Sequence, residues 1–449
     1  MFRQCVYWIV VWDVLRDPVR KYLAIHPLPL AFLAGIFWLL MATPSVGRNQ
    51  RNEIQSLFTD RLLVVALLCM IAFLFVGLCR GVLCGVPAGI LLLGLASYSL
   101  IVPGFLVGVM LRWRSTDALR WLEFCLLVNV PFLLTGVLEA AGVRSDLLGG
   151  ISMEWYRVRG DLHIPLPSGL FRSPDILGYH AATAFSIACI LLLASASRQA
   201  RWRYAFLATS VLFLLVLVAR RKMLGFVAVF LVYGLTYLSV VYRNVPWVQH
   251  RFPSVGVQRL TLALLLATLF VGPIPQVQYA VSTLSDLPGR LSVSFWKAPA
   301  TTIEQNGFWG RGLGIGTQGN YYLANKEPGV WQEDGISRLF LETGVLGAGF
   351  ALAFGMVVLL AVHRAQVRLI PQLLQITDSK QDVSKIDDYS KPVVLTGLAA
   401  LIVANGVTAA ISHQHISGDP LTIGLVGLYA GLFFSIARSD RPLAVEAAL

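Results

Sequence analysis

Long apolar runs separated by short polar segments occupy most of the chain. Each run is long enough to cross a hydrocarbon core of about 30 Å as a helix. The runs are apolar throughout, not at every second position, which predicts helices and not the strands of a barrel. We predict an all-α polytopic membrane protein with about 12 transmembrane helices, over residues 27–46, 61–79, 81–97, 99–112, 118–142, 174–196, 202–219, 222–242, 258–276, 336–362, 391–412 and 419–437.

The two short spans at 81–97 and 99–112 allow a second interpretation. No charged residue lies between Arg80 and Arg112, and Pro87 and Pro103 interrupt the apolar run. The run forms either two spans or one tilted helix, so the count is eleven or twelve. With one helix, the N-terminal half of the chain is inverted across the membrane, whereas the later loops keep the same relative sides.

The first 26 residues differ from the spans. Their apolar stretch Val6–Trp12 is too short to cross a bilayer. Three cations follow it, namely Arg16, Arg20 and Lys21. This pattern predicts an interfacial N-terminal segment over residues 1–26, with no cleavable signal peptide. Residues 27–437 then form a single transmembrane domain, and residues 438–449 form a cytoplasmic tail.

The composition agrees with a membrane protein. The 449 residues are 56% hydrophobic and 13% charged, whereas a soluble protein usually has about 25% charged residues. The net charge of +12 is explained by basic residues that flank the spans, so no nucleic acid partner is expected. None of the six cysteines belongs to a CxxC pair, so neither a disulfide framework nor a metal site is expected, and no cofactor is implied.

The loops sort by charge. Twelve spans put both termini on one side, which then receives most of the loop cations, including Arg16, Arg20, Lys21 and Arg80. The positive-inside rule makes that side cytoplasmic. The other side receives residues 47–60, 143–173 and 277–335, and the last is the large loop between the ninth and tenth spans. Long loops rich in glycine and aromatic residues are commonly functional, so the working surface is expected on the non-cytoplasmic side.

Arg220, Arg221 and Lys222 form a short turn between spans on this non-cytoplasmic side. Cations held near a membrane against the charge bias usually bind a ligand, and an anionic lipid phosphate fits them. The alternative is that their flexible stems only reach the headgroups.

The span that begins near residue 174 has an unexplained cation before it. Ser173, Pro174 and Asp175 are typical of a helix start. They do not account for Arg172, which could complete an anion site at the helix N-terminus. His180 lies about two turns inside the apolar region, where a lone histidine is more often a hydrogen-bonded packing residue.

The large loop contains the run Gly310–Gly316. It lacks the Lys-Ser/Thr of a P-loop and no strand precedes it, which excludes a nucleotide site. Glu333 and Asp334 lie at the mouth of the next helix. Arg338 and Glu342 are four residues apart and share one face of that helix. This pair is either a structural ion pair shielded from lipid, or part of a site. In the second case Glu333 or Glu342 is a general base and Arg338 binds an anionic leaving group.

The last outer turn contains Ser-His-Gln-His at residues 412–415. Two histidines at this spacing can ligate a metal, but Asp419 is the only acid nearby, so a polar turn is favoured.

Taken in order, four segments resemble the bacterial O-antigen ligase and polymerase superfamily. They read Phe-Arg-Ser-Pro-Asp-Ile-Leu-Gly over 171–178, Ala-Arg-Arg-Lys-Met-Leu-Gly over 219–225, Gly-Arg-Gly-Leu-Gly-Ile-Gly over 310–316 and Leu-Glu-Thr-Gly-Val-Leu-Gly over 341–347. The resemblance covers roughly residues 120–440. Order and topology carry it, because each motif alone is weak.

The resemblance implies a metal-independent, inverting glycosyltransferase of the GT-C type. Such enzymes lie in the bacterial inner membrane, face the periplasm, and move a glycan from undecaprenyl diphosphate to an acceptor hydroxyl in polysaccharide and O-antigen biosynthesis. The implied partners are the lipid-linked glycan, a polysaccharide or lipid acceptor, membrane lipids, a flippase and a chain-length regulator. The implied diphosphate-binding residues are Arg172, Arg220, Arg221 and Arg311, and the catalytic candidates are Glu333, Asp334, Arg338 and Glu342.

One motif of the family differs here. Its ligases carry a His-Asn pair just before the Leu-x-Glu-x-Gly helix, whereas residues 332–338 read Gln-Glu-Asp-Gly-Ile-Ser-Arg. The difference favours a polymerase of lipid-linked repeats, with Glu333 or Asp334 in place of the histidine. The alternatives are an O-antigen ligase that joins finished glycan to lipid A-core, and a secondary transporter. A transporter predicts inverted repeats, and the sequence has no such symmetry.

Overall fold

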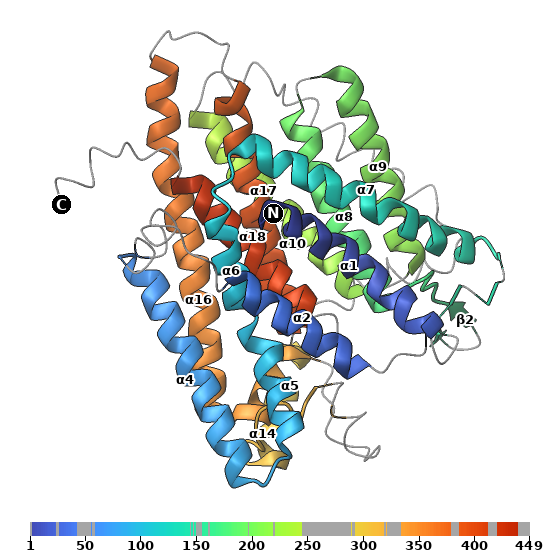
Figure 1. Ribbon diagram of the computed structural model, residues 1–449, viewed down its shortest axis with the longest axis vertical. Coiled ribbons are helices and arrows are strands. Elements are labelled where there is room, and N and C mark those ends of the chain that lie inside the picture. The colour runs from blue at the N-terminus through green and yellow to red at the C-terminus, as the bar shows by residue number, and fades with distance from the viewer. Residues whose placement is uncertain are drawn as a thin grey trace.

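The computed structural model of the protein describes residues 2–23, 27–42, 55, 59–143, 145–146, 148–149, 155–159, 162–195, 197–218, 221–244, 289, 292–317, 320, 334–378, 386–411 and 420–438. Almost all of this part of the chain is helical (Figure 1). Its elements are α1 (Phe2–Leu23), α2 (Pro27–Ala42), α4 (Arg61–Leu83), α5 (Ala88–Ser99), α6 (Ile101–Met110), α7 (Ser115–Ala140), β1 (Tyr156–Arg159), β2 (Leu162–Pro165), α8 (Pro174–Ala194), α9 (Arg198–Val218), α10 (Arg221–Asn244), the π-helical turn η1 (Val293–Lys297), α14 (Ala298–Asn306), α16 (Gly335–Asp378), α17 (Ile386–Ile411) and α18 (Pro420–Arg438).

The protein is a multi-pass membrane protein. Within the described residues, nine helical segments are long and apolar enough to cross a bilayer: α4, α5 with α6, α7, α8, α9, α10, α16, α17 and α18. Large apolar side chains on α4 point outward, among them Leu68, Ile71 and Phe75. Such exposure is expected where a helix faces lipid and not water. The predicted span 258–276 lies outside the described residues.

The apolar stretch at 88–110 is one crossing with a break, which selects the single-helix alternative of the sequence analysis. At a rise of about 1.5 Å per residue, α5 and α6 alone are each too short to cross the membrane. Together they form a 23-residue apolar segment, Ala88–Met110, interrupted at Leu100. The α6 half packs closely on α18, because Gly104 and Gly108 face small residues of that helix.

Helix α1 lies along α7, where the sequence predicted an interfacial segment. Near its start, Arg3 pairs with Asp117 in the first turn of α7, at 3.7 Å. Near its end, Lys21 donates to the carbonyl of Gly149 and interacts with Glu139 at the far end of α7. The distance from Arg3 to Lys21 along the helix is about 27 Å, close to a bilayer core. Helix α1 packs against the bundle in this way because its apolar face is buried in the main core.

Contacts between helix ends divide the bundle into two sides. On the terminus side, Arg438 at the end of α18 pairs with Asp60 before α4, and Ser390 on α17 bonds to Ser115 on α7. On the loop side, the start of α18 meets α1 through Thr422, and the start of α10 meets that of α16. Asp60 therefore lies on the side opposite the later loops, as the single-helix alternative implies and the twelve-span version does not.

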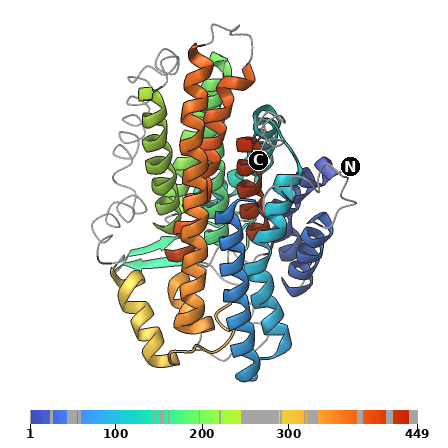
Figure 2. The same cartoon turned by 90° about the vertical axis from the view of Figure 1, so that its left-hand side faces the viewer.

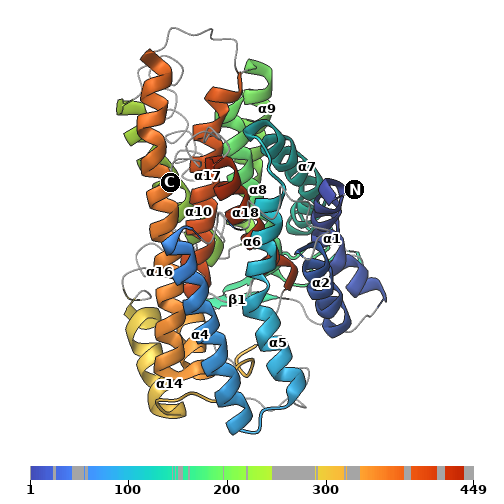
Figure 3. The ribbon, with the colours of Figure 1, turned by 60° about the vertical axis from the view of Figure 1, so that its left-hand side comes forward.

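Helix α16 is the longest element, with 44 residues, and extends through most of the long dimension of the molecule (Figure 2). Along part of its length, α16 packs beside α4. Its helical path is interrupted at Gly344, which has φ 65° and ψ −169°. The chain that follows α14 comes close to α4, α5 and the first part of α16 (Figure 3). This end of the bundle contains the glycine-rich run.

A short antiparallel hairpin is the one departure from all-α structure among the described residues. Strands β1 and β2 pair in the register Tyr156 with Pro165 and Arg159 with Leu162. The hairpin lies within the predicted loop 143–173. It returns the chain to Ser168 and Gly169, whose N–H groups both donate to the carboxylate of Glu139 on α7.

Candidate functional site

The glycine-rich run is built into the break of α16. With the helix interrupted at Gly344, Val345 donates to the carbonyl of Phe308 at 2.9 Å, and the carbonyl of Leu341 accepts from Arg311 at 2.7 Å. Gly312 likewise donates to the carbonyl of Glu342, at 2.9 Å. Backbone polar groups at membrane depth must be satisfied inside the protein, and the loop replaces the missing helical bonds.

The same run packs against α4 and α5. Leu313 donates to the carbonyl of Gly77 at 3.1 Å, and its side chain is fully buried. Gly314 has φ 90°, and a Cβ there would overlap the carbonyl oxygen of Ile90 on α5. The N–H groups of Arg311, Gly312 and Leu313 are therefore engaged by main-chain carbonyls and are not directed at a phosphate.

The Arg338–Glu342 pair lies beneath this loop. Arg338 donates through Nε to Oε1 of Glu342 at 2.7 Å, and both side chains are 0% exposed. Oε1 of Glu342 also accepts from the N–H of Gly316 at 3.0 Å, and the guanidinium of Arg338 lies 5.2 Å from the centre of the Tyr98 ring. This geometry favours the structural alternative for the pair. We name the segment Phe308–Gly316 with Arg338 and Glu342 the loop anchor.

The N-terminus of α16 is more open. The carboxylate of Asp334 accepts from the N–H of Ser337 at 2.7 Å, as a helix cap does. Partial burial raises the pKa of Asp334, while the Ser337 N–H and the ammonium of Lys222 act to lower it. Lys222 belongs to the first turn of α10, which is more than a hundred residues earlier in the chain. The fold thus brings Lys222 of the cationic turn near the predicted carboxylate of Asp334.

Two arginines lie at the outer edge of the loop anchor. Arg311 is exposed. Arg80, near the end of α4, donates through Nε to the carbonyl of Gly310 at 2.9 Å. With twelve separate spans, the charge sorting put Arg80 on the same side as Arg438, whereas here α4 ends on the opposite, loop side. This is the inversion that the single-helix alternative implies, because α5 and α6 form one crossing.

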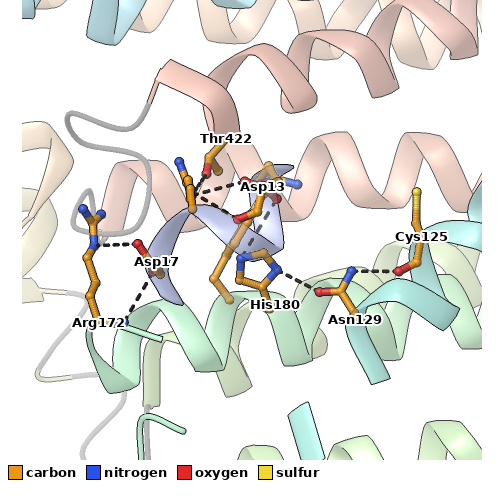
Figure 4. Close-up of polar contacts among 10 residues, drawn as sticks. Asp13, Asp17, Cys125, Asn129, Arg172, His180 and Thr422 are labelled. Atoms are coloured by element: carbon orange, nitrogen blue, oxygen red, sulfur yellow. Dashed lines mark hydrogen bonds and ion pairs between the residues drawn. The ribbon is translucent and has the colours of Figure 1, made fainter. Parts of the chain in front are cut away.

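Arg172 belongs to a different group of charges, shown in Figure 4. The Nε atom of Arg172 lies 3.8 Å from Oδ1 of Asp17 on α1. The main-chain N–H of Arg172 donates to Oδ2 of the same carboxylate at 3.4 Å. Asp17 is 3% exposed, so Arg172 compensates a buried carboxylate. One turn earlier on α1, Asp13 pairs with Arg16 at 3.2 Å, and Arg16 also donates to the hydroxyl of Thr422 on α18. These contacts place Arg16 near the start of α18, on the loop side.

His180 lies deeper in the same group. Its Nδ1 is 2.8 Å from Oδ1 of Asn129 on α7, and its Nε2 is 4.0 Å from Oδ2 of Asp13. The ring stacks on Phe171 with centroids 4.7 Å apart. A small cavity, large enough for a water molecule, lies beside Asp13, Asn129 and His180. We name Asp13, Asp17, Asn129, Arg172 and His180 the α1 cluster.

The predicted site residues thus fall into two sets. Asp334, Arg338 and Glu342 lie along the first turns of α16, where Lys222 of α10 acts on Asp334 and the main chain of Arg311 bonds to Leu341. Arg172 instead contacts Asp17 on α1. Arg220, Glu333 and residues 412–419 lie outside the described residues, as do most of 277–335 and the side chain of Arg221.

Several buried polar residues were not singled out from the sequence. Asp13 and Asp17 carried a signal, because two acids four residues apart in a largely apolar helix are unusual. Asn129 and Tyr98 carried none, since single polar or aromatic residues are common in apolar helices. Their partners come from other helices and become apparent only in the fold.

Comparison of the sequence with models of known protein families gave no match, and comparison with curated proteins gave no relative. The geometry at the start of α16 and the motif order in the sequence therefore carry the functional interpretation.

Proposed function

We propose that this protein polymerises undecaprenyl-diphosphate-linked glycan at the loop side of the membrane. The observation that supports this most is the meeting of two helix starts. Arg221 and Lys222 open α10, Asp334 opens α16, and Lys222 is close enough to influence the carboxylate of Asp334. A cationic turn for a lipid diphosphate would then lie next to a carboxylate that can accept a proton.

In the proposed reaction, an acceptor hydroxyl attacks the anomeric carbon from the face opposite the diphosphate. The new C–O bond forms as the bond to the phosphate oxygen breaks, and the diphosphate leaves with the electron pair. Asp334 takes the proton of the hydroxyl. Burial raises the pKa of Asp334, which makes it a better base than an exposed carboxylate. Arg221 and Lys222 offset the charge of the leaving diphosphate.

Arg338 and Glu342 have a positioning role in this scheme. Both are 0% exposed and bonded to each other, so neither side chain is accessible to an acceptor. They hold the loop anchor against α16. Arg311, which is exposed beside the anchor, is the residue of that loop that could contact the diphosphate or the glycan.

The topology fits a periplasmic loop side in a bacterial inner membrane. We count α1, α2 and the predicted span 258–276 in addition to the nine spans, which gives twelve crossings. Both ends of the described chain then lie on the terminus side. That side carries arginines at the helix ends, namely Arg112, Arg114, Arg198, Arg201 and Arg438. The positive-inside rule then favours the cytoplasm for the terminus side.

The experiment is complementation of a strain that lacks the gene, with analysis of surface polysaccharide and of the lipid carrier. We expect Arg221→Ala and Asp334→Asn to abolish long polymer and to leave single-repeat glycan on the carrier, with normal amounts of protein in the membrane. Arg201→Ala is the matched control, because Arg201 is exposed at the start of α9 on the terminus side. Normal polymer in both site variants contradicts the proposal.

Two further readouts sharpen the test. Since Asp334 must be deprotonated to act, polymer formation is expected to fall on acidification, at a pH above the usual range of an aspartate. A ligase is the second candidate, because the same order of motifs in the sequence supports it. Loss of a ligase would leave long glycan on the carrier, whereas loss of a polymerase leaves single repeats.

A further inference from the structure

The α1 cluster places an acid and a histidine against each other in the interior of the bundle. The side chains of His180 and Asp13 are 4% and 9% exposed, and the two groups come from α8 and α1. Ionisable groups inside a membrane protein are costly and usually serve a function. This pair is distinct from the residues at the start of α16.

The orientation of His180 follows from its neighbour on α7. Asn129 donates its amide N–H to the carbonyl of Cys125 at 2.7 Å, so its Oδ1 is the atom that faces the histidine. An oxygen acceptor at 2.8 Å from Nδ1 requires a proton on Nδ1. In the neutral ring Nε2 is then an acceptor, and it faces the carboxylate of Asp13, which is also an acceptor when ionised.

Two facing acceptors favour a bound positive charge. The carboxylate of Asp13 therefore lies between two groups, because Arg16 pairs with its Oδ1 and His180 faces its Oδ2. The adjoining cavity has room for about one water molecule, which excludes an organic ligand. Sodium and other hard cations prefer sets of oxygen ligands, whereas an imidazole nitrogen opposite a carboxylate is suited to a proton.

We propose that Asp13 and His180 form a proton-binding site that exchanges protons with the loop side, and that the cavity beside them holds the water next to the histidine. A proton delivered by water binds Nε2 of His180, forms an imidazolium opposite the carboxylate of Asp13, and leaves by the same route. Other ionisable groups facing the cavity are Cys125 from α7, Tyr179 from α8 and Tyr429 from α18. Thiol and phenol groups keep their protons in neutral water, whereas an imidazole can gain or lose one, so the proposal assigns the exchanging proton to His180.

The route to the loop side passes the other members of the cluster. His180 lies six residues after the start of α8 at Pro174, which is about 9 Å along the helix. Arg172 and Asp17 lie at that helix start, and Arg16 reaches Thr422 in the first turn of α18. A proton site at this depth would sense the pH of the compartment that the loop side faces.

The test uses the full-length protein in lipid nanodiscs with isotope-labelled histidine. Magnetic resonance follows the imidazole signal that disappears in His180→Gln, between about pH 5 and 9. We expect this signal to titrate, with Nδ1 protonated throughout and Nε2 gaining a proton on acidification. Asp13→Asn should lower the proton affinity at least about tenfold, since it removes an opposite charge within about 4 Å.

Two controls isolate the site. Asp117→Asn removes a carboxylate that pairs with α1 at its other end, and it should leave the titration unchanged. Replacing sodium by choline should also leave it unchanged. A signal that does not titrate, an unaltered midpoint in Asp13→Asn, or displacement by sodium overturns the proposal. If Asp13→Asn does not accumulate, the unmodified protein and the sodium exchange still decide. None of these readouts depends on glycan transfer.

Discussion

The loop anchor and the α1 cluster both hold charges inside the bundle, but they enclose them differently. In the loop anchor, Arg338 and Glu342 are fully buried under a backbone that crosses α4, α5 and α16. In the α1 cluster, Arg172 remains 22% exposed and His180 borders a cavity. The first arrangement leaves no path for exchange with solvent. The second places His180 beside a cavity with room for water, which the proposed proton exchange requires.

This difference separates structural from functional use of buried charge. A fully enclosed ion pair mainly fixes the position of the segments that carry it, because its desolvation cost offsets much of its attraction. Charged groups beside a cavity can change protonation without unfolding. The loop anchor therefore supports a site at the start of α16, and the α1 cluster is a separate proton site.

The largest effect is expected from breaking the ion pair of the loop anchor. Glu342→Gln or Arg338→Met leaves an uncompensated buried charge or polar group and should cost about 3–5 kcal/mol. The double variant Arg338→Met with Glu342→Leu should recover much of this loss, since neither charge remains. Thermal unfolding of the purified proteins in detergent gives the comparison. Additive losses in the double variant would contradict the interpretation as an enclosed pair.

A smaller loss is expected from the backbone of the loop anchor. Gly314→Ala places a Cβ against the carbonyl of Ile90 at φ 90°, and it should cost more than the roughly 1–2 kcal/mol of left-handed strain alone. Gly307→Ala is the matched control, with φ 81° and nothing within 4 Å of its Cβ. The difference in unfolding temperature between the two variants measures the close approach. Equal losses would mean that the loop does not pack tightly on α5.

The smallest effect is expected in the α1 cluster. Arg172→Ala leaves the carboxylate of Asp17 buried with one N–H donor, and it should cost about 1–3 kcal/mol. Arg203→Ala removes a pair with Glu123 in which the arginine is 57% exposed, and it should cost about 0–1 kcal/mol. Unfolding in the same detergent compares them. A loss for Arg172→Ala no larger than that of the control would show that Asp17 is not held as described.

The helices were predictable, because apolar runs are set by local sequence. Most predicted spans coincide with helices, and the alternative of one crossing at 88–110 was recognised from its missing charges. Helix α1 was not recognised as lying along a span. Asp13, Arg16 and Asp17 lower its hydropathy, and their partners come from α8 and α18.

The site was predictable only in part. The spacing of Arg338 and Glu342 gave their ion pair, since residues four apart meet on a helix. The sequence left open whether the pair is structural, because burial depends on a loop that returns from residues 308–316. It grouped Arg172 with the residues of the α16 start, whereas the fold pairs it with Asp17. Long-range contacts of this kind leave no local pattern.

The most direct test of the proposed function is an assay with the purified protein and a synthetic undecaprenyl-diphosphate-linked oligosaccharide, in the presence of a metal chelator. We predict products that grow by whole repeats, one undecaprenyl diphosphate released for each bond formed, and loss of both in Asp334→Asn but not in Arg201→Ala. A protein that leaves the donor intact, or that elongates it equally well in Asp334→Asn, would contradict the assignment of the reaction to the start of α16.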